Sequence, residues 1–499
     1  MGREFIDYIW KSRWNRSFVL IGMGICLLEF LLFKLQYPYV NYMPDSYSYL
    51  DTAYTNADVN IWPVAYSKFL RLVSVFTHSD KILSAVQYLF MQGSGLIFVF
   101  TLDYFFKLGK VAKYFLFVFF LLNPITLYIS NYVAADALFY GFSFLWMSSL
   151  FWIIYRPRPG QILITGILLL ICFTLRYYAI YYPVIMLFAF LLSAQHWRLK
   201  LAGIGLGLLL VLGSILYTSE KMLEVVGKRE FSAFGGWQLA NNALYMYEKI
   251  PPGERAPVPS RFAKLDGMVR QHLDTMDRVK KTHEDSTGNI FYLWSDKGPL
   301  IQYMLREMGK KDSTSTPGHF LFIPWASEGP LYADYGMYLI RTYPKEYARD
   351  FLWPNAMRYA LPPPEFLAIY NMGLDSVGKS AKDWFGYRTW KIAEGNSPNT
   401  IVAMAGYYSS FSLVVNIVLI IGLIGLSIFT RFGHAYADLN KLILTTFLFW
   451  GLNMVFSILA SPVVLRYQVF PTLFGLCVSV VLYDRIYHWE VGEPGINAK

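Results

Sequence analysis

Apolar stretches long enough to cross a lipid bilayer are the feature that most limits what this chain can fold into. A membrane-spanning helix needs about 20 mostly apolar residues. Ten stretches approach that length: residues 17–36, 82–104, 114–128, 135–155, 161–175, 179–194, 201–217, 409–429, 442–460 and 467–483. Only 16% of the residues are charged, against about 25% in an average soluble domain. The sequence therefore predicts an all-α polytopic membrane protein with about 10 transmembrane helices.

The lysines and arginines of the short loops indicate the orientation of these helices, because cytoplasmic loops are enriched in them. With the N-terminus inside, fifteen basic residues fall in inner segments and five in short outer segments. The five outer ones are Lys68, Arg71, Lys81, Arg176 and Arg466. We therefore expect both termini to be cytoplasmic, in a multi-pass protein of a bacterial inner (plasma) membrane.

A long polar region between residues 218 and 408 interrupts the apolar pattern and divides the chain into three parts. Residues 1–217 form an N-terminal transmembrane module, whose first outer loop, 37–81, carries predicted interfacial helices. Residues 218–408 are too long for a simple connection, and we expect a mixed, mostly helical periplasmic domain. Residues 409–499 hold the C-terminal transmembrane helices and a cytoplasmic tail. The three cysteines lie in apolar segments and show no disulfide or metal-ligand pattern.

Two acids lie just outside the membrane in consecutive outer loops. Asp45 falls in "NYMPDSYSYLDTA" (41–53), and Asp136 begins the predicted fourth helix. An acid in the first turn of a helix stabilises the exposed N–H groups, so each is readily explained as a helix cap. Two such acids near the same membrane boundary also favour a shared functional role.

Two arginines lie at the same boundary, each followed by tyrosine and then by a nearby proline. They are Arg176 in "FTLRYYAIYYP" (173–183) and Arg466 in "SPVVLRYQVFP" (461–471). Arginines near helix ends often extend to lipid headgroups. The alternative is phosphate binding, for which a planar guanidinium with five donors is well suited. Lys68 and Arg71 lie on a predicted interfacial helix within 62–77 and are weaker candidates for the same task.

In their order along the chain, these motifs resemble those of the GT-C class of integral-membrane glycosyltransferases. The most similar branch contains protein mannosyltransferases and aminoarabinose transferases. The resemblance is carried by "PDSYSY" (44–49), "WPVAYSKFL" (62–70), Gln87, the "NP" and "DALF" of 123–139, and "RYQVFP" (466–471). The family more often has glutamate where Asp136 stands. The resemblance covers residues 1–200 and 440–483 and does not extend to 218–408.

The resemblance implies transfer of a sugar from a polyprenyl-phosphate-linked donor to a glycan, lipid or protein acceptor, with inversion, at the outer membrane face. Asp45 is implied as general base. Arg176 and Arg466, helped by Lys68 or Arg71, would stabilise the departing phosphate.

Asp136 would orient the acceptor, hold a sugar hydroxyl or bind a cation. Some members of the class use a divalent metal and others do not. Two acids without a histidine or a further carboxylate motif argue against a fixed metal site, so no cofactor is firmly predicted and a divalent metal stays an open alternative. Tyrosines and a glutamine from the same motifs are predicted to bind substrate: Tyr49, Tyr66, Gln87, Tyr177 and Tyr467.

The polar region 218–408 holds two aromatic segments, "FGGWQLANNALY" (234–245) and "HFLFIPWASEGPLYADYGMY" (319–338). Because aromatic faces stack on sugar rings and acids bind sugar hydroxyls, Trp237 and Glu328 are predicted to contact substrate. Asn241 and Asn242 are weaker candidates. An aromatic core of a small domain is the ordinary alternative.

Two other functions stay open. A flippase or transporter of lipid-linked sugars needs polar groups along a midplane path and often paired repeats, but only Glu29 lies deep and no repeat is visible. A polysaccharide polymerase or ligase that uses a diphosphate-linked oligosaccharide would also have a large outer loop with arginines. An acid in the first outer loop is less expected there. No nucleic-acid partner is expected.

Overall fold

The computed structural model describes residues 2–282, 292–293, 295, 297–309, 322–392, 398–433 and 436–490. Within these ranges the chain forms helices and no β-strand. The cytoplasmic tail predicted beyond residue 490 lies outside them, as do residues 319–321 of the second aromatic segment. Helices of the apolar part are α2 (Arg13–Gln36), α5 (Asp80–Phe106), α6 (Lys110–Leu121), α7 (Pro124–Ser130), α8 (Asp136–Tyr155), α9 (Gln161–Leu175), α10 (Tyr182–Leu192), α11 (Trp197–Val226), α19 (Pro398–Thr430), α20 (Ala437–Ala460) and α21 (Leu465–Glu490).

Each of the ten apolar stretches coincides with helical structure. Among the described residues, eight helices are long and apolar enough to cross a membrane, counting α6 and α7 together as Lys110–Ser130. The other two predicted spans are the shorter apolar helices Gln161–Leu175 and Tyr177–Leu192. α6 and α7 separate at Asn123–Pro124, because proline disfavours a helical conformation in the residue before it. The chain is therefore a multi-pass membrane protein with eight candidate spans.

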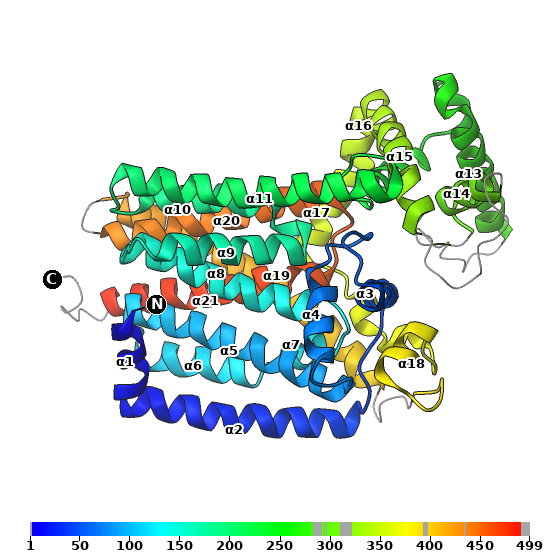
Figure 1. Cartoon of the computed structure of the whole chain (residues 1–499). Helices are drawn as coiled ribbons and strands as arrows, with labels where there is room; N and C mark the ends of the chain where they lie inside the picture. The colour runs from blue at the N-terminus through cyan, green and yellow to red at the C-terminus, as the bar shows by residue number, and fades with distance from the viewer. Residues whose placement is uncertain are drawn as a thin grey trace.

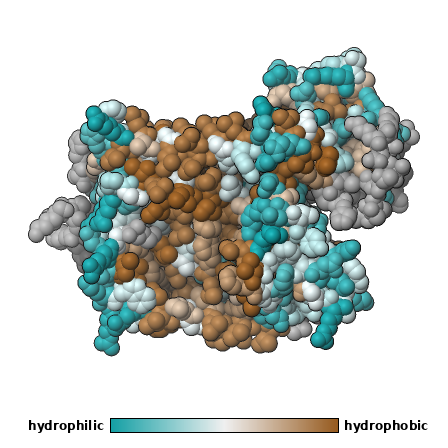
Figure 2. All heavy atoms as spheres, viewed as in Figure 1, coloured by the Kyte–Doolittle hydropathy of each residue, from teal (hydrophilic) through white to brown (hydrophobic). Residues whose placement is uncertain are grey.

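An apolar belt crosses the face of the bundle shown in Figure 2, between two hydrophilic ends. α2 and α11 contribute most directly, because only 17% of the apolar window in each is buried within the protein. Their exposed leucines and isoleucines would be costly in water and are suited to contact with lipid chains.

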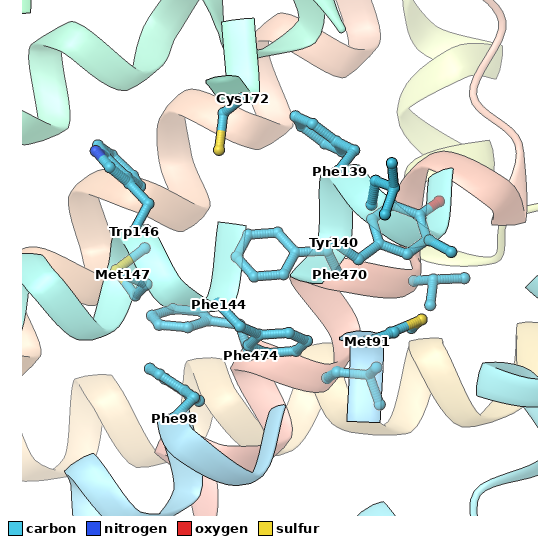
Figure 3. Packing of buried hydrophobic residues seen from close by; sticks show 14 of the residues in the cluster. Met91, Phe98, Phe139, Tyr140, Phe144, Trp146, Met147, Cys172, Phe470 and Phe474 are labelled. Atoms are coloured by element: carbon cyan, nitrogen blue, oxygen red, sulfur yellow. The ribbon is translucent and has the colours of Figure 1, made fainter. Parts of the chain in front are cut away.

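α8 forms the centre of the bundle and packs against α5, α9 and α21. Because 89% of its apolar window is buried, it is apolar on all sides rather than on one stripe. Figure 3 shows the packing of its aromatic side chains between α5 and α21. The ring of Phe144 lies 4.9 Å from that of Phe470, and Phe98 lies 5.7 Å from Phe474. This burial holds the first residue of α8, Asp136, in the middle of one end of the bundle.

The two ends of the bundle differ (Figure 1). At one end, which we call the α1 end, the N-terminal helix α1 (Arg3–Lys11) lies across the bundle. At the opposite end, the α3 end, lie α3 (Pro44–Thr55) and α4 (Ala65–Ser74), which form the loop between α2 and α5. The helices between α11 and α19 also gather there: α12 (Gly235–Tyr247), α13 (Ala263–Thr282), α14 (Pro299–Gly309), α15 (Phe322–Thr342), α16 (Pro344–Tyr347), α17 (Trp353–Ala360) and α18 (Lys379–Phe385).

The region predicted as one domain, 218–408, packs in two ways. Most of its first part, through Phe351, builds a second hydrophobic core around the crossing of α12 and α15. Glycines make that crossing close, since a Cβ at Gly236 would lie 1.9 Å from the carbonyl oxygen of Gly329. Residues from Leu367 to Ile392 join the core of the membrane bundle instead, and α18 packs against α3.

Candidate functional site

Four charged side chains from four distant segments meet at the α3 end of the bundle. Arg466 donates from Nη2 to Asp45 Oδ2 over 2.7 Å and from Nε to Asp136 Oδ2 over 3.0 Å. Arg176 donates from Nη2 to the same Asp136 oxygen over 2.7 Å. All four residues are buried, with exposed fractions of 2% to 8%. We call this group the charge network.

Local structure brings each member of the charge network to the same place. Asp45 lies in the first turn of α3, after Pro44, and Asp136 is the first residue of α8. Arg176 ends α9 in an extended conformation, and Arg466 is the second residue of α21. All four therefore lie where a helix begins or ends, at the boundary between the apolar belt and the hydrophilic α3 end.

The carboxylates are bound by arginines and not by helix N–H groups. Asp45 accepts its hydrogen bond from Arg466, and the backbone N–H of Met43 at the start of α3 is bound by the Ser46 hydroxyl. Asp136 accepts from both arginines and from the Tyr140 hydroxyl at 3.3 Å. The helix-cap explanation of the two acids is therefore not what the structure shows.

Each arginine keeps N–H donors beyond those that bind the two acids. The Nε atom of Arg176 is buried and has no hydrogen-bond partner among the described residues. Arg466 uses Nε and Nη2 on the carboxylates, and no bond from its Nη1 is found in the described part of the chain. Both guanidiniums are too deeply buried to extend to lipid headgroups. The unused donors are suited to an anionic oxygen brought in by a ligand.

A buried, electrically balanced network of this kind is weak evidence for a role in stability. Removing two carboxylates and two guanidiniums from water costs free energy that their mutual attraction often fails to recover. Clusters of this type are frequent at functional sites, where a charged ligand adds to the interactions. The network is therefore a reasonable candidate for a binding or catalytic site.

The charge network opens on two adjoining cavities. The first, which we call the carboxylate cavity, is lined by Asp45, Arg466, Glu365 and Asn241 among others. The second, the arginine cavity, is lined by Arg176 and by aromatic and apolar side chains, including the exposed Ile180. Side chains common to both cavities form the wall between them: Trp62, Phe234, Gln238, Ser461 and Tyr467.

Tyr467 and Tyr177 are the predicted substrate-binding tyrosines that line these cavities. The ring of Tyr467 lies 5.7 Å from the guanidinium carbon of Arg176 and 5.6 Å from that of Arg466, a distance at which a cation is attracted to an aromatic face. Tyr177 lines the arginine cavity and packs edge-on against Phe231 at 5.2 Å. Both side chains are placed to contact a ligand of Arg176.

Tyr49, Tyr66 and Gln87 lie behind the site and line neither cavity. Tyr66 packs edge-on against Tyr49 and donates from its hydroxyl to Gln87 at 2.7 Å. Gln87 in turn donates to the backbone oxygens of Ser130 and Tyr132, at 2.7 and 3.0 Å. Their contacts fix the loop that leads into Asp136. Their position supports a framework role, and their contact with substrate stays a prediction.

Lys68 and Arg71 bind the backbone of their own loop. Lys68 donates to the carbonyl and side-chain oxygens of Asn56 at 3.0 and 2.9 Å and pairs with Asp58 at 3.3 Å. Arg71 donates to the backbone oxygen of Ala53 at 2.9 Å, near the end of α3. Neither lines the carboxylate or the arginine cavity, so the predicted help in binding the donor phosphate finds no support in their position.

Trp237 and Glu328 also lie away from both cavities. Trp237 is fully buried, stacks on Trp325 at 3.7 Å, and donates from Nε1 to the backbone oxygen of Trp325 at 2.8 Å. It belongs to the aromatic core around α12 and α15, the ordinary alternative for this segment. Glu328 lies on α15 near Tyr332.

Glu365 is the site residue that sequence reasoning missed. It follows three prolines in "LPPPEF" (361–366) and lines the carboxylate cavity. Burial raises the pKa of its carboxyl to about 7, and the nearby guanidinium of Arg358 opposes part of that rise. An acid held at the end of a rigid proline run was the available signal. Trp62, in the quoted "WPVAYSKFL", was likewise not singled out.

No group of three or more histidine, cysteine, aspartate or glutamate side chains comes together within the described ranges.

Comparisons with known proteins give one distant likeness. No protein-family model and no curated protein matches the chain. Among solved structures, the chain is similar to the crystal structure of ArnT from Cupriavidus metallidurans bound to undecaprenyl phosphate. The TM-score is 0.33 and the identity 12%, over 95% of this chain and 77% of that one. A TM-score this low carries no argument about the site.

Proposed function

We propose that this protein is a membrane glycosyltransferase of the GT-C type, which moves a sugar from a polyprenyl-phosphate-linked donor to an acceptor. The observation that carries the proposal is the charge network, in which a buried line of acid, arginine, acid and arginine opens on two adjoining cavities. The α3 end would face the periplasm of a bacterial inner membrane. This orientation agrees with the distribution of basic residues among the short loops.

The arginine cavity is suited to the lipid-linked phosphate. Arg176 lines this cavity and has an Nε donor without a partner among the described residues, and the remaining walls are largely aromatic and apolar. Ile180, on the same wall, is exposed on the surface of the apolar part of the protein, where a polyprenyl chain would approach. As the phosphate departs it gains negative charge, and fixed N–H donors from Arg176 and Arg466 lower the barrier.

The carboxylate cavity is suited to the acceptor. The Oδ2 atom of Asp45 is bound to Arg466, and its Oδ1 accepts no hydrogen bond from any described residue. In the proposed step, the acceptor oxygen or nitrogen attacks the anomeric carbon as the bond from that carbon to the phosphate oxygen breaks. The bonding electrons leave with the phosphate, and Asp45 takes the acceptor proton. Direct displacement inverts the anomeric centre.

Asp136 acts as a positioning residue in this scheme. One of its oxygens accepts from both arginines, so it holds the two guanidiniums beside each other. Without that carboxylate, the two cations would repel one another. Its place at the start of the buried helix α8 fixes the pair relative to the bundle.

Release of polyprenyl phosphate by purified protein tests the proposal. The protein in detergent is mixed with short-chain polyprenyl-phosphate hexoses and pentoses and with a mixture of glycan, lipid and peptide acceptors. Mass spectrometry then follows both products. We expect release of polyprenyl phosphate together with an acceptor that carries one added sugar.

A flippase does not cleave the donor. If none of the hexose and pentose donors were cleaved, the result would contradict the proposal. Addition of a preassembled oligosaccharide from a diphosphate-linked donor would indicate a polymerase or ligase. Glu29, the acid within α2, accepts a hydrogen bond from Tyr88 at 3.0 Å, which accounts for it without a transport path.

A further inference from the structure

Asn241 is one of the residues that line the carboxylate cavity, and its side-chain amide has no hydrogen-bond partner among the described residues. It lies on α12, is 1% exposed, and neither its Nδ2 nor its Oδ1 forms a hydrogen bond with a described residue. A buried amide left unpaired costs free energy that a folded protein rarely tolerates without a reason. The arrangement indicates a ligand that supplies both a donor and an acceptor at this point.

The next residue on α12, Asn242, is also a buried asparagine, but its side-chain amide forms hydrogen bonds within the protein. Asn242 is also 1% exposed. Its Nδ2 donates to the backbone oxygen of Ala460 at 3.0 Å, and its Oδ1 accepts from Gln238 at 2.7 Å. Asn241 and Asn242 therefore share residue type, helix and burial, and differ in hydrogen bonding.

Glu365 lines the same cavity from the segment that follows α17. It directly follows Pro364 and has a backbone φ of 42°, a left-handed conformation that is unfavourable for a residue with a side chain. Such strain is often found at binding sites. The charged and titratable groups around it are Arg358 and Tyr245, with Asp45 and Arg466 on the wall of the same cavity.

We propose that Asn241 and Glu365 form a subsite that binds adjacent hydroxyl groups of the acceptor, which is therefore a sugar or another polyol. This inference rests on the proposed function for its assignment of the carboxylate cavity to the acceptor. The chemistry of the two side chains identifies the class of ligand.

Hydroxyl groups fit the unpaired atoms better than other common groups. An asparagine amide offers N–H donors and one acceptor oxygen, and each hydroxyl offers one donor and two acceptor lone pairs. Two neighbouring hydroxyls can therefore satisfy both ends of the Asn241 amide. A carboxyl group whose pKa burial raises to about 7 can accept from a hydroxyl when ionised and donate to one when protonated. The ring of Trp62, on the wall of the cavity, offers an apolar face for the sugar ring.

We assign the acceptor, and not the donor sugar, to this subsite because the proposed base and the proposed phosphate-binding arginine line different cavities. Asp45, the proposed base, lines the carboxylate cavity and must contact the acceptor proton. Arg176, proposed to bind the donor phosphate, lines the other cavity.

The matched variants Asn241→Ala and Asn242→Ala test whether the Asn241 side chain binds a ligand or stabilises the fold. We expect Asn241→Ala to raise the midpoint of thermal unfolding in detergent by a few degrees, because it removes an unpaired amide. Asn242→Ala should lower the midpoint, because it breaks the hydrogen bonds of this amide with Gln238, Leu459 and Ala460. Both changes alter helix propensity on α12 equally. An equal fall for the two variants would show that Asn241 is a structural residue and would overturn the proposal.

Ligand binding tests the chemical class and separates this proposal from the proposed function. Saturation-transfer NMR is measured with methyl glycosides of glucose, galactose, mannose and rhamnose, and separately with farnesyl phosphate. We expect at least one glycoside to bind the wild type, to bind at least ten-fold more weakly to Asn241→Ala, and to bind more weakly to Glu365→Gln. Farnesyl phosphate should bind both variants normally and should lose binding only in Arg176→Gln.

The outcomes are distinguishable. Glycoside binding without farnesyl phosphate binding would contradict the proposed function and leave the hydroxyl subsite standing. No glycoside binding by the wild type, or equal binding by Asn241→Ala, would overturn the subsite whatever farnesyl phosphate does. Farnesyl phosphate mannose serves as a third probe, and loss of its binding in Asn241→Ala, with methyl glycosides unaffected, would assign Asn241 to the donor sugar and overturn the acceptor assignment.

Discussion

Arg466 donates from Nη2 to Asp45 over 2.7 Å, although 421 positions of sequence separate the two residues. This contact joins the first helix after α2 to the last helix of the bundle. The other carboxylate oxygen of Asp45, Oδ1, accepts no hydrogen bond from any described residue. Arg466 therefore orients the proposed base and leaves Oδ1 available to accept a proton.

Asp45→Asn is expected to lower transfer by at least about 100-fold, the lower end of what general base catalysis contributes. The amide can still accept from Arg466 through its oxygen, so the fold should be retained. The measurement is the rate of polyprenyl phosphate release, beside the thermal midpoint.

Asp58→Asn, in the same loop, is the matched control, because Asp58 is half exposed and pairs with Lys68. We expect its rate to equal that of the wild type. A normal rate for Asp45→Asn would remove Asp45 as the base.

Arg176→Gln is expected to raise the KM for the donor far more than the KM for the acceptor, because it removes phosphate donors from the arginine cavity. It also leaves Asp136 with one arginine instead of two, and breaking a buried ion pair costs about 3–5 kcal/mol. The double variant Arg176→Gln with Asp136→Asn should recover part of that stability without recovering donor binding. Donor dependence that stays normal in a folded Arg176→Gln protein would contradict phosphate binding by Arg176.

The raised pKa of Glu365 predicts that the stability of the protein falls as the pH rises. Burial raises the pKa of Glu365 from 4.5 to about 7, so the folded protein keeps a proton that the unfolded chain releases. Where the folded state binds more protons, stability falls as the pH rises. The wild type should therefore lose thermal stability relative to Glu365→Gln between pH 4.5 and about 7, with a constant difference above that range. Parallel curves for the two proteins across this range would contradict the shifted pKa.

Gly236→Ala is expected to destabilise the α12–α15 crossing, because the new Cβ would lie 1.9 Å from the carbonyl oxygen of Gly329. Overpacking of this kind costs about 1–3 kcal/mol or more. Gly267→Ala, within α13 and with no atom within 4 Å of the new Cβ, should instead stabilise the protein by up to about 1 kcal/mol. Thermal unfolding in detergent compares them. Equal midpoints would mean that α12 and α15 can move apart at no cost, which would contradict the close glycine crossing.

The membrane helices could be predicted from sequence because the signal is local. About 20 consecutive apolar residues must form a helix in lipid, since each backbone group has to be satisfied within the segment. Each of the ten apolar stretches is helical in the structure. Gln161–Leu175 and Tyr177–Leu192 are helical as well, but they are shorter than the eight candidate spans.

The four residues of the charge network could also be predicted from sequence, because charges are rare at the edge of an apolar segment and each one needs a reason. Asp45, Asp136, Arg176 and Arg466 were identified in this way. Their neighbours were harder to assign, because tyrosines and tryptophans that bind sugars have the same composition as those that fill a core. Trp237 lies in a core, and Tyr467 lies in the wall between the two cavities.

The sequence by itself determined the helices, the apolar belt and the acids and arginines at its edge, because these depend on the hydropathy and charge of consecutive residues. Only the tertiary structure decided that Arg466 bridges Asp45 and Asp136 and that Glu365 joins the cavity beside them. It also decided that Asn241 has no hydrogen-bond partner among the described residues, whereas Asn242 is bonded. Those facts depend on how helices far apart in sequence pack against each other, and no local pattern of residues encodes that packing.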